Sequence, residues 1–366
     1  MNIDIGEELS SQRLGIEKLG WDKWFEGRST LQCRPIETVA RVAAVDRDQL
    51  LLLNDGGAFR AKLSGSYMYR HRLSQEFPCV GDWVCVEKHQ DDDIGLINAV
   101  LERKTSLRRK AAGGSVEFQM IAANIDYVII VQSCHFDFNL KRLERYLVMV
   151  MDGGAEPYVL LTKTDLVGPD ILTAQISQIR AAGVLAPVLT LSNVTREGIE
   201  ELKQILLPGK TYCFVGSSGV GKSTIVNELI GHDILEIKDV SATGEGRHTT
   251  VRRELIILQN GALVIDNPGM REFGILGSED GIAGGFSDIF NLASNCHYRD
   301  CTHTSEPGCA VLSALGAGEI DQKHYENYIK LKEESEFYQM SYAEKRKKDR
   351  DFGKYIKSAK KDLKQD

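Results

Sequence analysis

The chain has 366 residues, a net charge of −7 and a hydrophobic content of 42%, which is the composition of a globular protein. This length is enough for two or three domains. No run of about eighteen apolar residues is present, so no transmembrane helix is expected. The N-terminus lacks the basic start and apolar core of a signal peptide. We therefore expect a cytoplasmic protein without a membrane partner, whose eight cysteines are reduced or metal-bound rather than disulfide-paired.

The acidic charge argues against a protein that coats nucleic acid along its whole surface, because such proteins are usually basic. Any RNA contact must then come from local patches. Two stretches are candidates, namely RKTSLRRK at 103–110 and KRKKDRDFGKYIKSAKK at 345–361. For each stretch, a solvated surface without a partner is the alternative.

The first third of the chain predicts an N-terminal arm followed by a small barrel. Residues 1–35 are weakly patterned, with a short helix expected around 17–25 and little tertiary anchoring. From about residue 37, short β-like runs alternate with turn signals, as in TVARVAAV, QLLLLN, AFRAKL and DWVCVEK. Several short strands without a helical period favour a β-barrel over 36–103, and the oligonucleotide-binding (OB) type is among the common barrels of this size.

The middle of the chain predicts an α/β domain over 104–284. From about residue 121, apolar strands such as DYVIIVQS, PYVLLTK and TYCFVG alternate with helical stretches that several times end in glycine. Such a βαβ series forms a mostly parallel sheet with helices on both faces. Residues 285–366 then predict a mostly α-helical module, with a Cys/His cluster, a long helix and the basic tail.

One loop of this domain has the pattern of a phosphate-binding P-loop. Residues 216–223 fit GxxxxGK[ST] and lie between a predicted strand and a predicted helix, as the motif requires. The backbone N–H groups and the helix N-terminus attract phosphate. Lys222 is expected to reach the β- and γ-phosphates and Ser223 to bind Mg²⁺. The predicted nucleotide-binding residues here are Gly216, Ser217, Ser218, Gly219, Val220, Gly221, Lys222, Ser223 and Thr224.

Two later segments complete a predicted phosphate and Mg²⁺ site. Asp266 and Gly269 fit DxxG at the end of a strand, where the aspartate would hold Mg²⁺ and the glycine amide would contact the γ-phosphate. The loop GEGRHTTV at 244–251 lies where the first switch of a GTPase is expected. Either Thr249 or Thr250 would close on Mg²⁺, and the sequence does not choose between them.

The stretch LLTKTD at 160–165 resembles the loop that reads guanine. Asp165 would accept hydrogen bonds from guanine N1 and N2, which adenine does not offer, so adenine would leave buried acceptors unpaired. The stem of Lys163 would cover the base, and Thr162 begins the motif. Ser192 and Asn193, after the next strand, would supply a backbone contact to guanine O6.

The order of these motifs is unusual, because in an ordinary GTPase the phosphate loop comes first. Here both base-reading loops precede it, each at the end of a predicted strand. Joining the ends of the usual fold and cutting it after the second switch gives this order. Such a circular permutation is physically tolerable, because the termini of compact domains often lie close together. We therefore predict a circularly permuted P-loop GTPase that binds GTP or GDP.

The C-terminal module contains a predicted metal site. Cys296, Cys301, His303 and Cys309 form the pattern C-x4-C-x-H-x5-C. Three thiolates and one imidazole suit a closed tetrahedral site for one structural Zn²⁺. The adjacent His297 is a weaker candidate. The remaining cysteines are interpreted as core residues, namely Cys33, Cys79, Cys85, Cys134 and Cys213.

In its barrel, permuted GTPase and zinc module, the chain resembles the RsgA family of ribosome small-subunit-dependent GTPases over roughly residues 36–340. The resemblance is carried by GSSGVGKST, GRHTT, DNPG and the Cys3His pattern, together with PCVGDWV and AANIDYVIIV. It implies a late-acting assembly factor that binds the small ribosomal subunit and hydrolyses GTP there, and we expect the chain to be a monomer. The barrel and the zinc module would contact ribosomal RNA.

One position departs from the family pattern, and the catalytic residue is not fixed by the motifs. Thr162 stands where the guanine-reading motif NKxD usually has asparagine. Threonine keeps a hydroxyl but lacks the amide donor of asparagine. Met270 stands where a Ras-like GTPase has its water-orienting glutamine, and methionine cannot orient water. His248 in the predicted first switch is the nearest polar candidate, and the resemblance favours it as the catalytic residue. The alternative is a histidine that only packs or contacts RNA. Two other functions remain open: a nucleotide-gated RNA-binding protein with incidental hydrolysis, and an ATP-driven enzyme in which LLTKTD is accidental.

Overall fold

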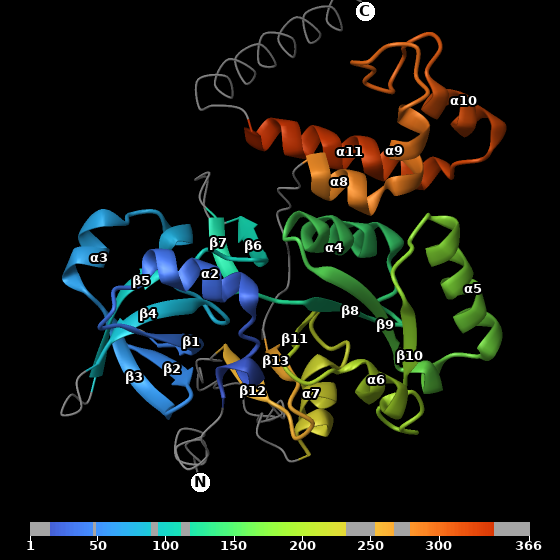
Figure 1. Ribbon diagram of the computed structural model, residues 1–366. Helices are drawn as coiled ribbons and strands as arrows, with labels where there is room; N and C mark the ends of the chain where they lie inside the picture. The colour runs from blue at the N-terminus through green and yellow to red at the C-terminus, as the bar shows by residue number, and fades with distance from the viewer. Residues whose placement is uncertain are drawn as a thin grey trace, which may run out of the picture.

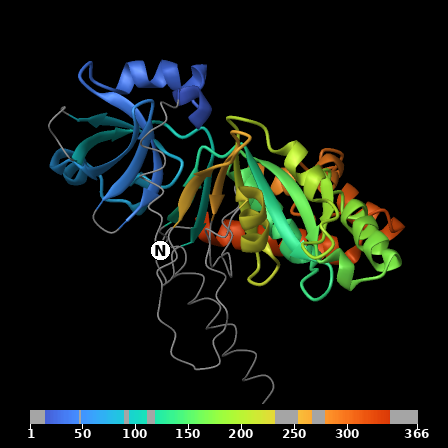
Figure 2. The same ribbon diagram turned by 90° about the horizontal axis from the view of Figure 1, so that it is seen from below.

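The computed structural model describes residues 15–46, 49–88, 94–110, 118–231, 253–266 and 279–339. A closed barrel lies at one end, and an α/β domain lies beside it with a helical module across one face (Figures 1 and 2). The barrel and the α/β domain share an eleven-stranded sheet, joined where β1 and β12 pair at Ala44 and Glu254. The predicted fold class is confirmed.

The barrel has five strands in the OB arrangement. Its sheet runs β1-β2-β3-β5-β4 and closes through a further β1–β4 pairing. The β3–β5 pair is parallel, so the chain must cross the barrel end between them, and α3 and η2 lie in that connection. The elements are β1 Thr38–Val45, β2 Leu50–Asn54, β3 Gly57–Leu63, α3 Gly65–Arg70, η2 Ser74–Glu76, β4 Trp83–Glu87 and β5 Ile94–Val100.

The N-terminal arm is anchored on the barrel, so the expectation of little tertiary contact is wrong. The arm contains η1 Ile16–Leu19 and α2 Lys23–Gln32. Leu19 is fully buried, and the ring centroid of Trp21 lies 4.7 Å from that of Trp83 in an edge-to-face contact. Such aromatic pairs stabilise beyond the area they bury. The short sequence pattern carried no sign of these partners, which lie far along the chain.

One disulfide corrects a second expectation. Cys33, just after α2, is bonded to Cys85 on β4, 52 residues away in sequence, and their Cα atoms are 5.4 Å apart. The arm folds back along the barrel and so brings the two thiols together. Spacing alone gave no indication of this pair. The other six cysteines are free.

The α/β domain has the predicted parallel sheet. Strands β10, β9, β8, β11 and β13 are parallel neighbours in that order, and β12 is antiparallel to β13. A hairpin of β6 and β7, which the sequence did not predict, precedes them. The strands are β6 Ser106–Lys110, β7 Phe118–Ala123, β8 Tyr127–Ser133, β9 Glu156–Thr162, β10 Val188–Leu191, β11 Thr211–Gly216, β12 Glu254–Ile257 and β13 Leu263–Asp266.

Helices cover both faces of this sheet. On β8, Ile130 belongs to the apolar cluster that includes α4 and α5, whereas Ile129 belongs to the cluster that includes α6 and α7. Alternate residues of a strand point to opposite faces, so a strand buried on both sides is apolar throughout. The elements between the strands are α4 Leu140–Asp152, η3 Thr164–Leu166, α5 Pro169–Ala181, α6 Ile199–Ile205 and α7 Lys222–Ile230.

The C-terminal module lies across α4 (Figure 1). It contains α8 Glu279–Gly285, α9 Ser287–Ala293, α10 Ala310–Ala317 and α11 Gln322–Gln339. Helix α8 approaches α4 closely because glycines face it: a Cβ on Gly281 would lie 2.7 Å from the Cβ of Asp152, and one on Gly285 would lie 2.7 Å from Val148 Cγ2. The second candidate stretch for RNA contact, 345–361, lies outside the described residues.

Candidate functional site

The predicted P-loop connects β11 to α7, at the centre of the sheet. Lys222 is buried, and its ammonium donates to the carbonyl oxygens of Gly216 at 2.8 Å and Ser217 at 2.6 Å. The side chain therefore folds over its own loop, at the N-terminus of the following helix. Ser223 and Thr224 are exposed at the start of that helix.

Glycine is required where this loop leaves the strand. Gly216 has a φ of 147°, and a Cβ there would lie 2.2 Å from the carbonyl oxygen of Val131 on the neighbouring strand. Gly221 has a φ of 101°, with the Asn193 side-chain nitrogen 3.0 Å from where its Cβ would be. Both backbone conformations strongly favour glycine. The P-loop thus lies close to β8 and to Asn193.

The two loops that the sequence predicts to read the base lie beside the P-loop. In the parallel ladder, Thr162 at the end of β9 pairs with Leu191 of β10 and with Ser133 of β8. The carboxyl ends of parallel strands meet at one edge of a sheet, which is where open α/β folds bind ligands. Gly216 ends β11 at this same edge, paired with Val131 of β8. The structure therefore brings together the loops that the sequence separates.

Asp165 is held by a side chain from the other base loop. The Ser192 hydroxyl donates to Asp165 Oδ1 at 2.5 Å, and Ser192 Oγ accepts from the backbone N–H groups of Val194 and Thr195. Ser192 is fully buried whereas Asp165 is exposed. The serine thus fixes one carboxylate oxygen. The sequence predicted only a backbone role for Ser192 and missed this contact, because the two residues are 27 positions apart.

Lys163 and Thr162 complete the first base loop. Lys163 has a φ of 60°, in the left-handed region, so the chain turns sharply directly after β9. The Thr162 side chain is fully buried, and its hydroxyl lies 2.7 Å from the carbonyl oxygen of Val220 in the P-loop. Sequence reasoning did not find this contact.

Several predicted site residues are not described. His248, Thr249, Thr250 and Gly269 lie outside the described residues. Asp266 is described only by its backbone, as the last residue of β13. Its strand is parallel to β11 and ends at the same edge of the sheet.

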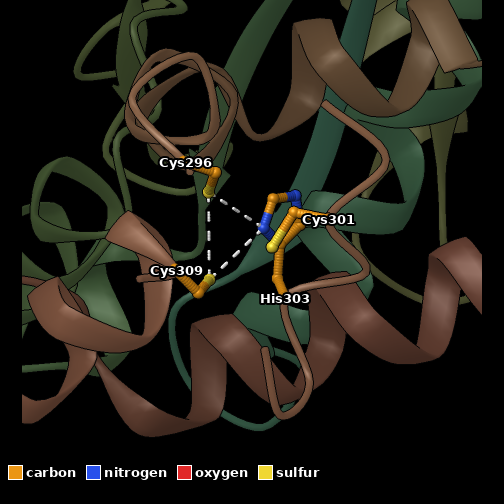
Figure 3. Close-up of side chains that lie close together, drawn as sticks. All are labelled: Cys296, Cys301, His303 and Cys309. Carbon is orange, nitrogen blue, oxygen red and sulfur yellow. Dashed lines mark hydrogen bonds between the residues drawn. The ribbon is translucent and has the colours of Figure 1, made fainter. Parts of the chain in front are cut away.

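The four predicted metal ligands converge in the C-terminal module (Figure 3). Sγ of Cys296 lies 3.9 Å from Sγ of Cys309, and His303 Nδ1 lies 3.6 and 3.5 Å from these two sulfurs. All four ligand atoms, including Cys301 Sγ, lie within 4.8 Å of one another. Tetrahedral zinc with Zn–S bonds of about 2.3 Å requires sulfurs about 3.8 Å apart. The geometry therefore fits one Zn²⁺.

Local structure presents these ligands. Cys309 is the N-cap of α10, and its sulfur accepts the backbone N–H of Leu312 at 3.4 Å. The backbone N–H of Ala310 points at Cys296 Sγ, also at 3.4 Å. N–H groups directed at sulfur stabilise thiolate charge. His297 does not belong to the cluster; it is exposed and packs against Tyr298.

The basic stretch at 103–110 is largely engaged within the protein. The side chains of Arg103, Lys104 and Arg108 form ion pairs with Asp82, Asp22 and Asp152, respectively. A cation that already has a carboxylate partner offers less attraction to a phosphate. The geometry thus favours a structural role for most of this stretch.

The strand order, the P-loop and the two base loops define a circularly permuted P-loop GTPase. The model of the family described as "RsgA GTPase" matches residues 100–276. The chain belongs to this family. No helix in the described part of the chain combines the length and apolar character needed to cross a membrane.

Curated relatives cover most of the chain. It is 40% identical to "Small ribosomal subunit biogenesis GTPase RsgA 1" of Listeria innocua, over 88% of this chain and 90% of that protein. It is 36% identical to the protein of that name from Bacteroides thetaiotaomicron, over 96% and 99% of the two chains.

Two solved structures have the same fold. YjeQ from Thermotoga maritima is 27% identical, with a TM-score of 0.63 over 82% of this chain and 98% of that one. YloQ, titled a circularly permuted GTPase, is 24% identical, with a TM-score of 0.60 over 84% and 97%. At 24% identity, the similarity to YloQ supports the fold alone.

Proposed function

We propose that this GTPase acts in biogenesis of the small ribosomal subunit, and that it hydrolyses GTP faster when bound to that subunit. Relatives that share 36–40% of its residues over most of its length carry this role in their names. The observation that carries the proposal is the meeting of both base loops with the P-loop at one sheet edge. A guanine-specific site assembled in this way suits a nucleotide-driven assembly step.

The proposed nucleotide contacts follow from this geometry. Asp165, with one oxygen fixed by Ser192, accepts from guanine N1 and N2, and Lys163 covers the base. The backbone at Ser192 and Asn193 meets guanine O6. The P-loop amides hold the phosphates, and Lys222 exchanges its loop carbonyls for phosphate oxygens. This exchange keeps a buried ammonium paired in both states.

The proposed metals are Mg²⁺ and one structural Zn²⁺. Ser223, Asp266 and either Thr249 or Thr250 would hold Mg²⁺, which neutralises developing phosphate charge. The three cysteines and His303 would hold Zn²⁺ in a closed set, without a catalytic role.

For catalysis we propose His248 as the residue that orients the attacking water, since Met270 cannot do so. Replacing it by alanine is expected to lower subunit-stimulated turnover by at least about a hundredfold, the lower end of the usual range for a lost general base or water-orienting group. Turnover of His248→Ala within a few-fold of wild type would remove this role.

We further propose that the barrel and the zinc module contact ribosomal RNA, with the chain acting as a monomer in the cytoplasm. The parts would be an arm (1–35), the barrel (36–103), the GTPase domain (104–284) and the zinc module with its tail (285–366). The net charge of −7 requires that RNA contacts be local.

The test is GTP turnover by the purified chain alone, with isolated small subunits, and with isolated large subunits as the control. We expect stimulation of at least about tenfold by small subunits only, equivalent to about 1.4 kcal/mol of barrier. Binding to the small subunit without stimulation would instead favour a nucleotide-gated RNA-binding protein.

A further inference from the structure

One covalent bond ties the N-terminal arm to the barrel. Cys33 directly follows helix α2 and is bonded to Cys85 on β4. The two sulfurs differ in access, because Cys33 is partly exposed whereas Cys85 is fully buried. Cys85 is also fixed by the sheet, where it lies opposite Val39 of β1 and Ala99 of β5. A small thiol that approaches from solvent therefore meets Cys33 first.

The end of α2 depends on this bond. The buried anchors of the arm, Leu19 and Phe25, lie in its first part, whereas residues 30–32 are all exposed. A glycine at position 27 further lowers the helix propensity of the segment. Reduction should thus free the last turn of α2, while the beginning of the arm stays packed on the barrel.

The two thiols remain within reach of each other after reduction. Only a short stretch of chain separates Cys33 from Val39, which pairs directly with Cys85 in the sheet. The turn between them is closed by Glu37, whose carboxylate accepts from the backbone N–H and the Nε of Arg34, both at 2.7 Å. A short tether keeps the effective concentration of the partner thiol high. The bond can therefore form again without refolding of the barrel.

We propose that Cys33 and Cys85 form a reversible thiol–disulfide site, in which Cys33 exchanges with a small-molecule disulfide or thiol and Cys85 resolves the product. Oxidation locks the end of α2 onto β4, and reduction releases it. This chemistry is independent of the proposed GTPase function. Its use in a cell rests on the proposed cytoplasmic location, where protein disulfides are usually transient.

The exchange has two steps, with glutathione disulfide as the oxidant. The Cys33 thiolate attacks one sulfur of glutathione disulfide, whose S–S bond breaks, so that one glutathione thiolate leaves and a mixed disulfide forms on Cys33. The Cys85 thiolate then attacks Cys33 Sγ and displaces the second glutathione. Two electrons pass from the protein to the oxidant, and the two departing glutathione thiolates take up the two thiol protons. Reduction by glutathione is the reverse and begins at Cys33.

Two carboxylates and one guanidinium lie beside the pair. A carboxylate oxygen of Glu37 is within 4.8 Å of both sulfurs. Glu87 follows Cys85 on the same face of β4, and Arg34 pairs with both carboxylates. The resulting negative charge disfavours a thiolate. The exchange is therefore expected to be slow at neutral pH, so the oxidised fraction is measured at equilibrium rather than from initial rates.

The test uses the full zinc-loaded chain under native conditions, in glutathione buffers that range from fully reduced to fully oxidised. Alkylation followed by peptide mass spectrometry locates the free thiols. We expect the bond between Cys33 and Cys85 to open and to form again reversibly. In the reduced chain the amides of residues 29–33 should exchange with solvent several-fold faster, whereas those of β4 should keep their protection.

Two variants separate the roles of the sulfurs. In Cys85→Ser, glutathione disulfide should leave a stable glutathione on Cys33, because the resolving thiol is absent. In Cys33→Ser, Cys85 should stay unmodified, because it is buried. Cys79 is the internal control in both variants: burial raises the pKa of its thiol well above the usual range, so it should not react. Should Cys85→Ser not fold, Cys85→Ala takes its place.

Three results would overturn the inference. A bond that survives an excess of reduced glutathione in the folded chain would be a permanent structural crosslink. Glutathione on Cys85 rather than on Cys33 would contradict the assigned roles. Uptake of a second zinc by the reduced chain, lost in Cys33→Ser, would make Cys33, Glu37 and Cys85 a metal site instead. None of these measurements uses nucleotide or ribosomal subunits, so their outcome is distinct from a failure of the proposed function.

Discussion

Arg41 is a fully buried cation that connects three parts of the molecule. Its guanidinium donates to the backbone carbonyls of Leu19 in the arm, Gly81 in the barrel and Asn124 before β8. Burial lowers the pKa of Arg41 to about 10, although the charges of Asp126 and Asp82 oppose this shift. The group therefore remains protonated at neutral pH, with its cost of burial offset by these bonds.

Replacing Arg41 by lysine should destabilise the arm and barrel by about 3 kcal/mol, because one ammonium cannot meet three diverging carbonyls. All three tryptophans lie in this region, at positions 21, 24 and 83. Urea unfolding followed by tryptophan fluorescence therefore reports on it directly. The control is Arg109→Lys, whose guanidinium bonds to Gln119 at the surface. A loss below about 0.5 kcal/mol, the usual range for surface changes, would contradict this role.

At the residue scale, the sequence predicts local motifs and misses long-range contacts. The P-loop pattern is contiguous, so Lys222 could be placed in its loop from spacing alone. The bonds from Ser192 to Asp165 and from Thr162 to Val220 depend on which strands are neighbours. No local pattern encodes that arrangement.

The loop between α9 and α10 carries three of the four predicted zinc ligands. Cys296, Cys301 and His303 are held between two short helices, and His303 has a φ of 65°, which is uncommon for a residue with a side chain. Metal binding can supply the free energy that such a loop lacks. The loop is thus expected to lose its order when the metal is removed.

We expect one zinc per chain, and less than about a tenth of that in Cys301→Ser, because apparent zinc affinity falls steeply when a thiolate ligand is lost. Zinc is measured by elemental analysis and the midpoint of thermal unfolding by calorimetry, where it should fall. Both His297→Ala and Cys134→Ala, which lie outside the ligand set, should keep their zinc content, and the exposed His297→Ala should also keep the midpoint. Full zinc content in Cys301→Ser would contradict the assignment.

Helix α11 contacts the GTPase domain through a buried ion-pair network. His324 is 3% exposed; its Nδ1 lies 2.5 Å from Glu144 Oε1 on α4, and its Nε2 lies 3.1 Å from Asp288 Oδ2 on α9. Burial alone would lower the pKa of His324, but the bonds and charges of Asp288 and Glu144 outweigh it and raise the pKa to about 9. The charged imidazolium therefore stabilises this contact at neutral pH.

Because the pKa is raised on folding, this stabilisation is complete below about pH 6.5 and is lost as pH rises through about 9. Its size is at most on the order of 3 kcal/mol. Protection of the α11 amides from hydrogen exchange, corrected for the intrinsic pH dependence, should decrease as the pH rises from about 6.5 to about 9. His324→Gln should flatten the profile, whereas His297→Gln, at an exposed position, should not. An unchanged slope in His324→Gln would assign the effect to other groups.

At the element scale, most strands and helices of the α/β domain agree with the prediction, because apolar strands alternate there with helical stretches. The β6–β7 hairpin and the arm are exceptions. The apolar residues of the arm are few, and they are buried only because the barrel lies against them, as Leu19 and Trp21 show. The Cys33–Cys85 pair depends on that same docking.

At the scale of the whole molecule, the permuted order assembles one site from two distant halves of the domain. The base loops follow β9 and β10 at one side of the sheet, and the P-loop follows β11 nearer its centre. The motifs were placed by sequence, and their order predicted the permutation. How the barrel, the sheet and the zinc module pack together could not be predicted from the sequence, because long-range contacts such as the pairing of β1 with β12 leave no periodic pattern.

The most direct test of a single guanine site is a change of base specificity. Xanthine has a carbonyl where guanine has the 2-amino group, so an amide donor at position 165 should favour it. We expect wild type to bind GDP and not ADP, and Asp165→Asn to lose about a hundredfold in GDP affinity while gaining xanthosine diphosphate. Competition against a fluorescent nucleotide measures the affinities for GDP, ADP and xanthosine diphosphate. Effective competition by ADP, or unchanged GDP affinity in Asp165→Asn, would contradict the account.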